Sequence, residues 1–142
     1  MKTKEIRQIV NFADELGIDS RELFDNIEAN ETDFLIDDTY RFIKEGDIDT
    51  IQAEELKSDP YILGCFTDWF ISDCTDLAPE IVQALQEGEQ FEAIGNHIID
   101  NDYLEIMQEE YARLDGYGHH FSSYDGSEDE TLLNLGYYTF HV

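Results

Sequence analysis

The chain has 142 residues, 34 of them Asp or Glu against eight Lys or Arg, which gives a formal net charge of −26 at pH 7. This length fits one domain, and 42% hydrophobic residues are enough for a folded core despite the charge. Nucleic acid and anionic membranes are excluded as direct partners because they would repel the protein, so we expect a basic protein partner. The N-terminus lacks the apolar run of a secretory signal, which predicts a cytoplasmic protein.

Two amphipathic helices are predicted at the start of the chain. The first covers residues 3–16, where apolar residues recur at helical spacing and Gly17 provides a stop. Asp19 or Ser20 caps a second, short helix. This helix carries three acids and one base, which does not suit a DNA-binding helix-turn-helix, so the pair is interpreted as a simple αα-hairpin.

Two further helices are predicted before the middle of the chain. One covers residues 32–44 and ends at Gly46, and a short one begins at Asp49 or Thr50. Both show apolar residues at helical spacing.

Residues 59–74, DPYILGCFTDWFISDC, predict the central helix of the fold. Asp59 is a suitable N-cap and Pro60 suits the first helical position. Apolar side chains, Trp69 among them, cover most of the helical wheel, as in a buried helix. The segment is too short and too acidic to span a membrane.

Helices are also predicted from Pro79 onwards and over residues 102–114. In the first, the apolar stripe changes side after Gly88, which predicts a break there. In the second, the predicted inward face consists of Tyr103, Ile106, Met107, Tyr111 and Leu114.

The C-terminal part changes character, with glycines, a turn at Asp125 and Gly126, and β-favouring aromatic residues. Strands are predicted at residues 119–124 and 137–142, with a short additional one at 132–135 and an acidic loop at 127–130. The predicted fold class is mainly α (α+β). We expect one domain, residues 1–142, in which helices in 1–114 surround the buried central helix and 115–142 form a β-hairpin.

No set of residues predicts a catalytic or metal site. His119 and His120 are adjacent, so on a strand they would point to opposite faces, and the acidic segments do not match a calcium loop. No spacing suits zinc, and nothing resembles a nucleophile elbow around the serines. Cys65 and Cys74 would be too far apart on one helix for a disulfide and are expected to be buried thiols. We therefore expect no cofactor and no metal.

Carboxylates provide the main functional signal. Asp102, Glu105 and Glu109 lie at i, i+3 and i+7 on one predicted helix face, with Glu110 beside them, although like charges at this spacing destabilise a helix. Residues 58–142 contain only one base, Arg113. The carboxylates expected to contact the partner are Glu87, Glu89, Glu92, Asp102, Glu105, Glu109, Glu110, Asp125, Glu128, Asp129 and Glu130.

The chain resembles, as a class, the small acidic inhibitors of host defence that phages and mobile elements encode. The stretches DPYILGCFTDWF and DGYGHHFSSYDGSEDE also look like parts of phage proteins. The resemblance implies a non-enzymatic nucleic-acid mimic, of the anti-CRISPR or anti-restriction type, that binds a basic nucleic-acid-binding host protein or complex. Two alternatives stay open: an acidic adaptor or immunity-type protein that binds a basic partner elsewhere, and a small carboxylate–histidine enzyme.

Overall fold

The computed structural model describes residues 1–124, 126 and 132–142. It is mainly helical with a small antiparallel sheet, so the predicted class, mainly α (α+β), is confirmed. The chain divides into two compact units. The sheet unit contains Met1–Ile48 and Asp115–Val142, and the helical unit contains Asp49–Leu114.

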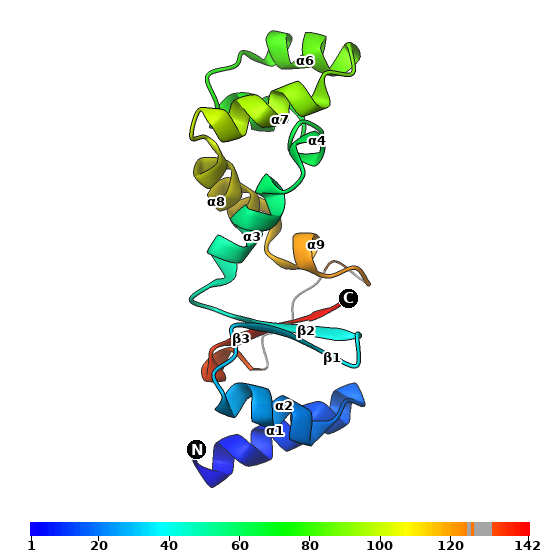
Figure 1. Ribbon diagram of the computed structural model, residues 1–142, viewed down its shortest axis with the longest axis vertical. Helices are drawn as coiled ribbons and strands as arrows, with labels where there is room; N and C mark the ends of the chain where they lie inside the picture. The colour runs from blue at the N-terminus through cyan, green and yellow to red at the C-terminus, as the bar shows by residue number, and fades with distance from the viewer. Residues whose placement is uncertain (125, 127–131) are drawn as a thin grey trace. The chain divides into compact units, whose positions relative to one another are not determined.

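The sheet unit is built on three antiparallel strands in the order β1-β2-β3. Its elements are α1 (Thr3–Leu16), α2 (Ser20–Glu28), β1 (Asp33–Ile36), β2 (Tyr40–Lys44), α9 (Gly118–Phe121), the 3-10 helix η1 (Leu133–Leu135) and β3 (Tyr137–His141). Helices α1 and α2 cover one face of the sheet, and α9 lies over the other (Figure 1).

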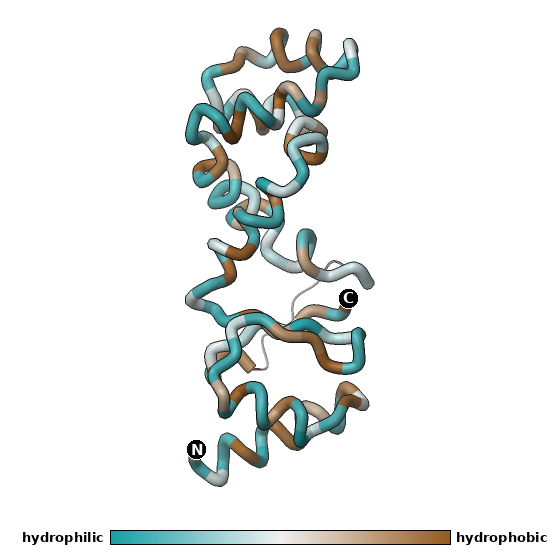
Figure 2. The backbone as a smooth tube through the Cα atoms, viewed as in Figure 1, coloured by the Kyte–Doolittle hydropathy of each residue, from teal (hydrophilic) through white to brown (hydrophobic). Residues whose placement is uncertain are grey.

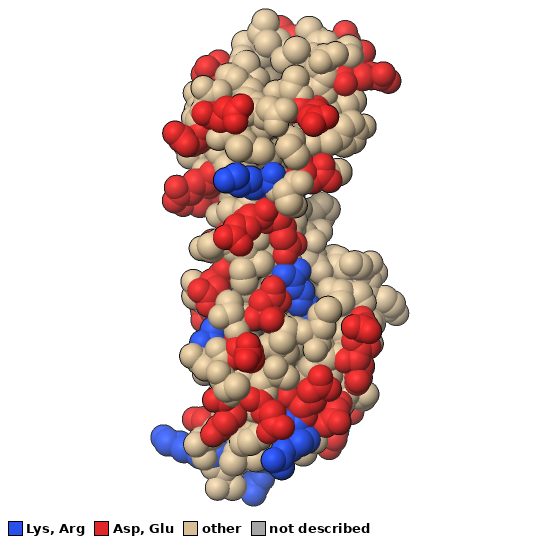
Figure 3. Space-filling view, in the orientation of Figure 1, with Lys and Arg blue, Asp and Glu red and all other residues tan. Residues whose placement is uncertain are grey.

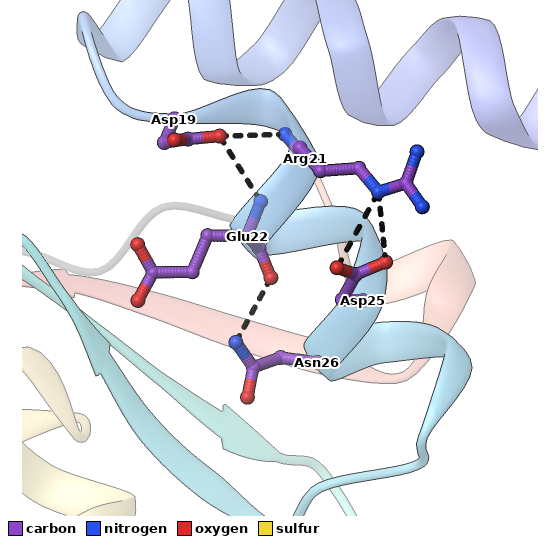
Figure 4. Close-up of polar contacts among 5 residues, drawn as sticks. All are labelled: Asp19, Arg21, Glu22, Asp25 and Asn26. Atoms are coloured by element: carbon purple, nitrogen blue, oxygen red, sulfur yellow. Dashed lines mark hydrogen bonds and ion pairs between the residues drawn. The ribbon is translucent and has the colours of Figure 1, made fainter.

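The α1–α2 hairpin is specified by local capping and confirms the sequence prediction. Gly17 ends α1 in the left-handed conformation, at φ 70°. Asp19 then caps α2, because its Oδ1 accepts hydrogen bonds from the backbone N–H groups of Arg21 and Glu22 at 2.9 and 3.1 Å. Arg21 also pairs with Asp25 one turn later, at 3.2 Å (Figure 4).

The core of the sheet unit lies between this hairpin and the sheet. Phe42 of β2 stacks on Phe34 of β1 and meets the ring of Phe12 from α1 edge-on. The other buried members are Ile9, Ala13, Ile18, Leu23, Ile27, Ile36, Leu132 and Tyr137. Tyr137 donates its phenol hydrogen to the carbonyl of Glu31 at 2.6 Å, and burial raises the pKa of this phenol.

The helix predicted over residues 32–44 is wrong, because this segment forms the β1–β2 hairpin. Asp37 and Asp38 both adopt the left-handed conformation, at φ 56° and 53°, and turn the chain. Asp tolerates that conformation better than most residues. Across the two strands, Arg41 binds Asp33 with two hydrogen bonds of 2.8 and 2.7 Å.

The C-terminal strand is confirmed as β3, but its predicted partner is wrong. Strand β3 pairs with β2. Residues 119–121 instead belong to the short helix α9, and residues 133–135 of the possible third strand form the 3-10 helix η1. Phe121 of α9 packs on Phe140 of β3 and under the guanidinium of Arg41, so this segment covers the sheet instead of extending it. The predicted acidic loop at 127–130 lies outside the described residues.

The helical unit is formed by short helices. They are α3 (Ile48–Lys57), which begins one residue before the unit, α4 (Pro60–Leu63), α5 (Asp68–Cys74), α6 (Pro79–Glu87), α7 (Phe91–Asp100) and α8 (Leu104–Asp115). The break predicted at Gly88 is confirmed, since α6 ends there and α7 begins at Phe91. The helix predicted over 102–114 corresponds to α8.

Packing in the helical unit brings α4 against α7 at very short range. Gly64 follows α4 and Gly95 lies within α7, and each one faces the backbone of the other segment. The buried side chains around them are Leu56, Leu63, Phe70, Ile71, Cys74, Val82, Ile94, Ile98, Met107 and Tyr111. Of the predicted inward face of α8, Met107 and Tyr111 are buried, but Ile106 and Leu114 are exposed and that part of the prediction is wrong.

The continuous central helix predicted over residues 59–74 is also wrong. Asp59 caps α4 as expected, with its Oδ1 accepting from Ile62 N–H at 3.3 Å, but the helix ends after one turn. The side chain of Gln86 donates to the carbonyls of Gly64 and Phe66 at 2.9 and 2.8 Å. These carbonyls therefore bond to a distant side chain instead of continuing the helix, and α5 starts anew at Asp68.

Trp69 is exposed, at 53% of its surface, although the sequence predicted that it is buried. It contacts the ring of Phe70 edge-on, a contact worth about 1 kcal/mol. We therefore expect Trp69→Ala to lower the free energy of unfolding by only about 1 kcal/mol, as measured by urea denaturation. Tryptophan fluorescence of the folded protein should be red-shifted. A blue-shifted emission and a loss of about 3 kcal/mol or more would instead indicate a buried indole.

Hydropathy changes over short distances along the described part of the chain. Polar and apolar residues are interspersed along the helices (Figure 2). Within the described residues, no helix is long and apolar enough to cross a membrane.

Candidate functional site

A groove of about 440 Å³ opens between α3 and α8 in the helical unit. Three of the predicted carboxylates, Asp102, Glu105 and Glu109, lie along its α8 side. The residues that line it are Asp49, Thr50, Ala53, Glu54, Lys57, Ile99, Asp102, Leu104, Glu105, Gln108 and Glu109. Ligand sites in proteins typically have volumes of about 300–1,000 Å³, so the groove has room for a side chain or a small ligand.

The side chains that form the two walls of the groove recur at helical spacing. On α8, Glu105 and Glu109 are one turn apart, and on α3, Asp49 and Ala53 are likewise one turn apart. Asp102 precedes α8 and adopts the left-handed conformation at φ 62°, which starts α8 directly after α7. Most of each wall thus follows from one face of a single helix, to which Ile99 of α7 and Asp102 before α8 are added.

A buried amide forms part of the groove lining. Gln108 is only 2% exposed, and its Nε2 donates to Asp49 Oδ1 at 2.8 Å and to Gln52 Oε1 at 2.9 Å. Gln52 is completely buried. These bonds join α3 to α8 and fix one carboxylate of the groove in place.

The groove has a strongly negative lining. Five carboxylates and one ammonium group, that of Lys57, contribute a formal charge of −4 at pH 7. The apolar contribution comes from Ala53, Ile99 and Leu104. Acidic side chains also outnumber basic ones on the face of each unit seen in Figure 3. A cation with an aliphatic part is the chemical complement of such a lining.

The remaining predicted carboxylates lie elsewhere. Glu110 does not line the groove and instead binds Arg113 at 2.7 Å, and this guanidinium lowers the pKa of the Glu110 carboxyl. Glu87, Glu89 and Glu92 are exposed around the α6–α7 turn and are not part of the groove either. Asp125, Glu128, Asp129 and Glu130 lie outside the described residues.

The histidines do not gather into one site. His97 Nε2 lies 2.7 Å from Asp76 Oδ1, and the hydrogen bond from His97 lowers the pKa of that carboxyl. His141 is stacked between Tyr40 and Tyr124, with ring centroids 4.6 and 4.1 Å away. In the described part of the chain, no group of three or more His, Cys, Asp or Glu residues is arranged to hold a metal ion.

The two cysteines differ in exposure, so the expectation that both are buried is wrong for Cys65. Cys65 is exposed and Cys74 is buried, and neither is in a disulfide. Burial, followed by the negative charges of Glu110 and Asp73, raises the pKa of the Cys74 thiol to about 11.

The thiol reactivities should therefore be clearly separated. At pH 8, Cys65 should react with a chromogenic disulfide reagent at once, and Cys74 only when the helical unit opens, because its reactive thiolate is suppressed. Since the folded-state pKa is the higher one, this thiol favours folding below about pH 9, and that contribution should decline as the pH rises towards 11. Stopped-flow absorbance of the parent and of Cys65→Ser measures the two reaction rates. A fast reaction of the single-cysteine variant would contradict the slow reaction expected for Cys74.

The α3 wall of the groove was missed by the sequence analysis. Asp49, Glu54 and Lys57 are about 50 residues before α8 in the chain, and nothing local links the two helices. The one available signal was Gln108, a polar residue beside the buried Met107 on α8. Such a polar residue at an inward position needs a buried hydrogen-bond partner, which Asp49 and Gln52 provide.

Comparison with known proteins adds no further information on the site. No protein-family model matches the chain, and neither curated proteins nor solved structures gave a significant match.

Proposed function

We propose that this protein is a non-enzymatic inhibitor that occupies the nucleic-acid-binding groove of a basic host defence protein or complex. It would act as a nucleic-acid mimic, of the anti-CRISPR or anti-restriction type, in the cytoplasm of a bacterial host. The observation that carries the proposal is the groove between α3 and α8, where five carboxylates converge in a chain of net charge −26.

Several features of the groove support an electrostatic mimic. Glu105 and Glu109 are four residues apart on α8, or about 6 Å along the axis. This is similar to two steps of about 3.4 Å along one strand of duplex DNA. Arg and Lys side chains that normally bind phosphates form charge-assisted hydrogen bonds with carboxylates equally well. Like charges kept together at the expense of helix stability are more easily explained by a partner than by solubility.

Competition with nucleic acid tests the proposal. The tagged protein is used to capture partners from bacterial lysate at low and high salt, and the captured proteins are identified by mass spectrometry. We expect a basic nucleic-acid-binding protein that is released as salt shortens the Debye length from about 10 Å at 0.1 M to about 3 Å at 1 M. Duplex DNA or guide RNA should displace the inhibitor from this purified partner. A partner that binds equally well with saturating nucleic acid would contradict mimicry.

A second candidate is an adaptor that binds its basic partner outside any nucleic-acid site. The exposed Trp69, Tyr61 and Ile62 of α4 and α5 favour it, because aromatic residues are enriched at the centres of protein interfaces. In that case Trp69→Ala should weaken binding about tenfold or more, and competing nucleic acid should have no effect.

A further inference from the structure

The amide cluster beside the acidic groove is incompletely hydrogen-bonded. Both hydrogen bonds of the Gln108 side chain use its Nε2, so Oε1 accepts none from any residue that the structure describes. The neighbouring Gln52 has a buried Nε2 that also lacks a partner within the described residues. A buried polar atom without a partner, such as Gln52 Nε2, is rare in folded proteins, and an acceptor without a partner on the almost fully buried Gln108 is also uncommon.

Asp49 fixes the orientation of the Gln108 amide. An ionised carboxylate only accepts hydrogen bonds, so Gln108 must turn its Nε2 towards Asp49 Oδ1, 2.8 Å away. A flipped amide would place two acceptor oxygens in contact. Oε1 is therefore left as an acceptor on a side chain that lines the groove.

The rest of the lining suits a cation that carries several N–H donors. Glu105 and Glu109 offer charged acceptors on the α8 wall, while Ala53, Ile99 and Leu104 offer apolar contact for an aliphatic stem. A lysine ammonium has three donors and is strongly hydrated. A guanidinium has five donors in a planar fork, is more weakly hydrated, and binds carboxylates with two parallel hydrogen bonds.

We infer that the groove between α3 and α8 is a binding pocket for an arginine side chain of the partner. Its guanidinium donates to Gln108 Oε1 and to the α8 carboxylates. This inference rests on the proposed function and names the chemical group that the groove recognises. It also explains why a neutral acceptor on an almost fully buried side chain is kept among the carboxylates, which an unspecific acidic surface would not need.

Substitution of Lys57 tests the inference because its expected effect on arginine affinity is opposite to that of substituting a carboxylate. Its ammonium group lines the same groove as the five carboxylates, so it repels an entering cation. Lys57→Gln should tighten arginine binding, whereas Glu105→Gln should weaken it. If binding depended only on the charge of the whole chain, Glu22→Gln on α2 of the other unit should weaken it as much as Glu105→Gln does.

The experiment is an NMR titration of the full chain with N-acetyl-arginine amide at low salt. N-acetyl-lysine amide and the uncharged N-acetyl-citrulline amide serve as comparisons. We expect shifts of the Gln108 side-chain amide signals, with those of the exposed Gln90 as a reference, and about fivefold tighter binding of arginine than of lysine, which corresponds to one additional net hydrogen bond. Citrulline should not bind. Gln108→Met should remove the preference for arginine over lysine.

The possible outcomes separate this inference from the proposed function. Equal binding of arginine and lysine, or shifts confined to residues outside the groove, would overturn the arginine pocket. If Gln108→Met does not fold, the shifts of the Gln108 side-chain signals in the parent protein still show whether arginine binds in the groove. A partner that is displaced by nucleic acid although the arginine probe does not bind would leave the proposed function intact and refute the pocket. Arginine binding without competition from nucleic acid would support the pocket and contradict mimicry.

Discussion

Gly95→Ala is expected to lower the free energy of unfolding by about 3 kcal/mol or more, the upper range for overpacked cores. A Cβ atom at Gly95 would lie 1.8 Å from the carbonyl oxygen of Pro60, and one at Gly64 would lie 1.9 Å from that of Phe91. Both obstacles are backbone atoms, which cannot rotate away as a side chain can. The α4 segment and α7 would have to separate by more than 1 Å to restore ordinary contact distances.

Separation would also open the core around Leu63, Ile94 and Ile98, all of which are fully or almost fully buried. The loss is therefore a large part of a typical total stability of about 5–15 kcal/mol. Helix propensity alone predicts the opposite sign, because alanine is favoured over glycine within a helix by about 1 kcal/mol. Gly95→Ala thus distinguishes packing from propensity in a single measurement.

Gly88→Ala is the matched control in the same unit. The added Cβ would meet nothing closer than 3.5 Å, and Gly88 has φ −82°, which alanine adopts without strain. We expect a change within about 0.5 kcal/mol for this control. Urea unfolding followed by circular dichroism compares Gly64→Ala, Gly95→Ala and Gly88→Ala with the parent. Equal midpoints for all three variants would show that α4 and α7 are not in close contact.

Elements fixed by local interactions were the ones that the sequence predicted. Helix α1 and its stop at Gly17, the Asp19 cap of α2 and the break at Gly88 each depend on residues within a few positions of one another. The β1–β2 hairpin was missed because its turn uses Asp37 and Asp38 in the left-handed conformation, instead of the more familiar glycine-containing pairs.

Tertiary contacts decided the remaining cases. The segment 59–74 has the composition of a buried helix, but Gln86 binds its Gly64 and Phe66 carbonyls and α4 ends there. Likewise β3 was recognised as a strand, whereas its pairing with β2, about a hundred residues earlier, has no local signal. Helical spacing found the α8 wall of the groove, but only the fold could bring Asp49 and Glu54 of α3 to face it.

The second large effect is expected from removing the charge of the α8 wall. Asp102→Asn, Glu105→Gln and Glu109→Gln together keep the shape of the groove while changing its formal charge from −4 to −1. If each lost pair with a basic partner weakens binding by about 1 kcal/mol, the triple variant should bind roughly 100-fold less tightly. It should also show a shallower dependence of affinity on salt and compete less well with duplex DNA or guide RNA. The fold should be intact or slightly more stable, since the repulsion between like charges one turn apart is removed.

A triple variant in the sheet unit separates a local contact from the effect of net charge. Asp14→Asn, Glu22→Gln and Glu28→Gln remove the same number of charges from exposed positions of α1 and α2. Titration calorimetry with the captured partner at several salt concentrations compares the two triple variants with the parent. Because long-range attraction depends on total charge, it should weaken similarly in both, whereas the loss of direct pairs should appear only in the groove variant. Equal affinities for the two variants would exclude the groove from the interface. Binding that was also insensitive to salt and to nucleic acid would favour the adaptor over the mimic.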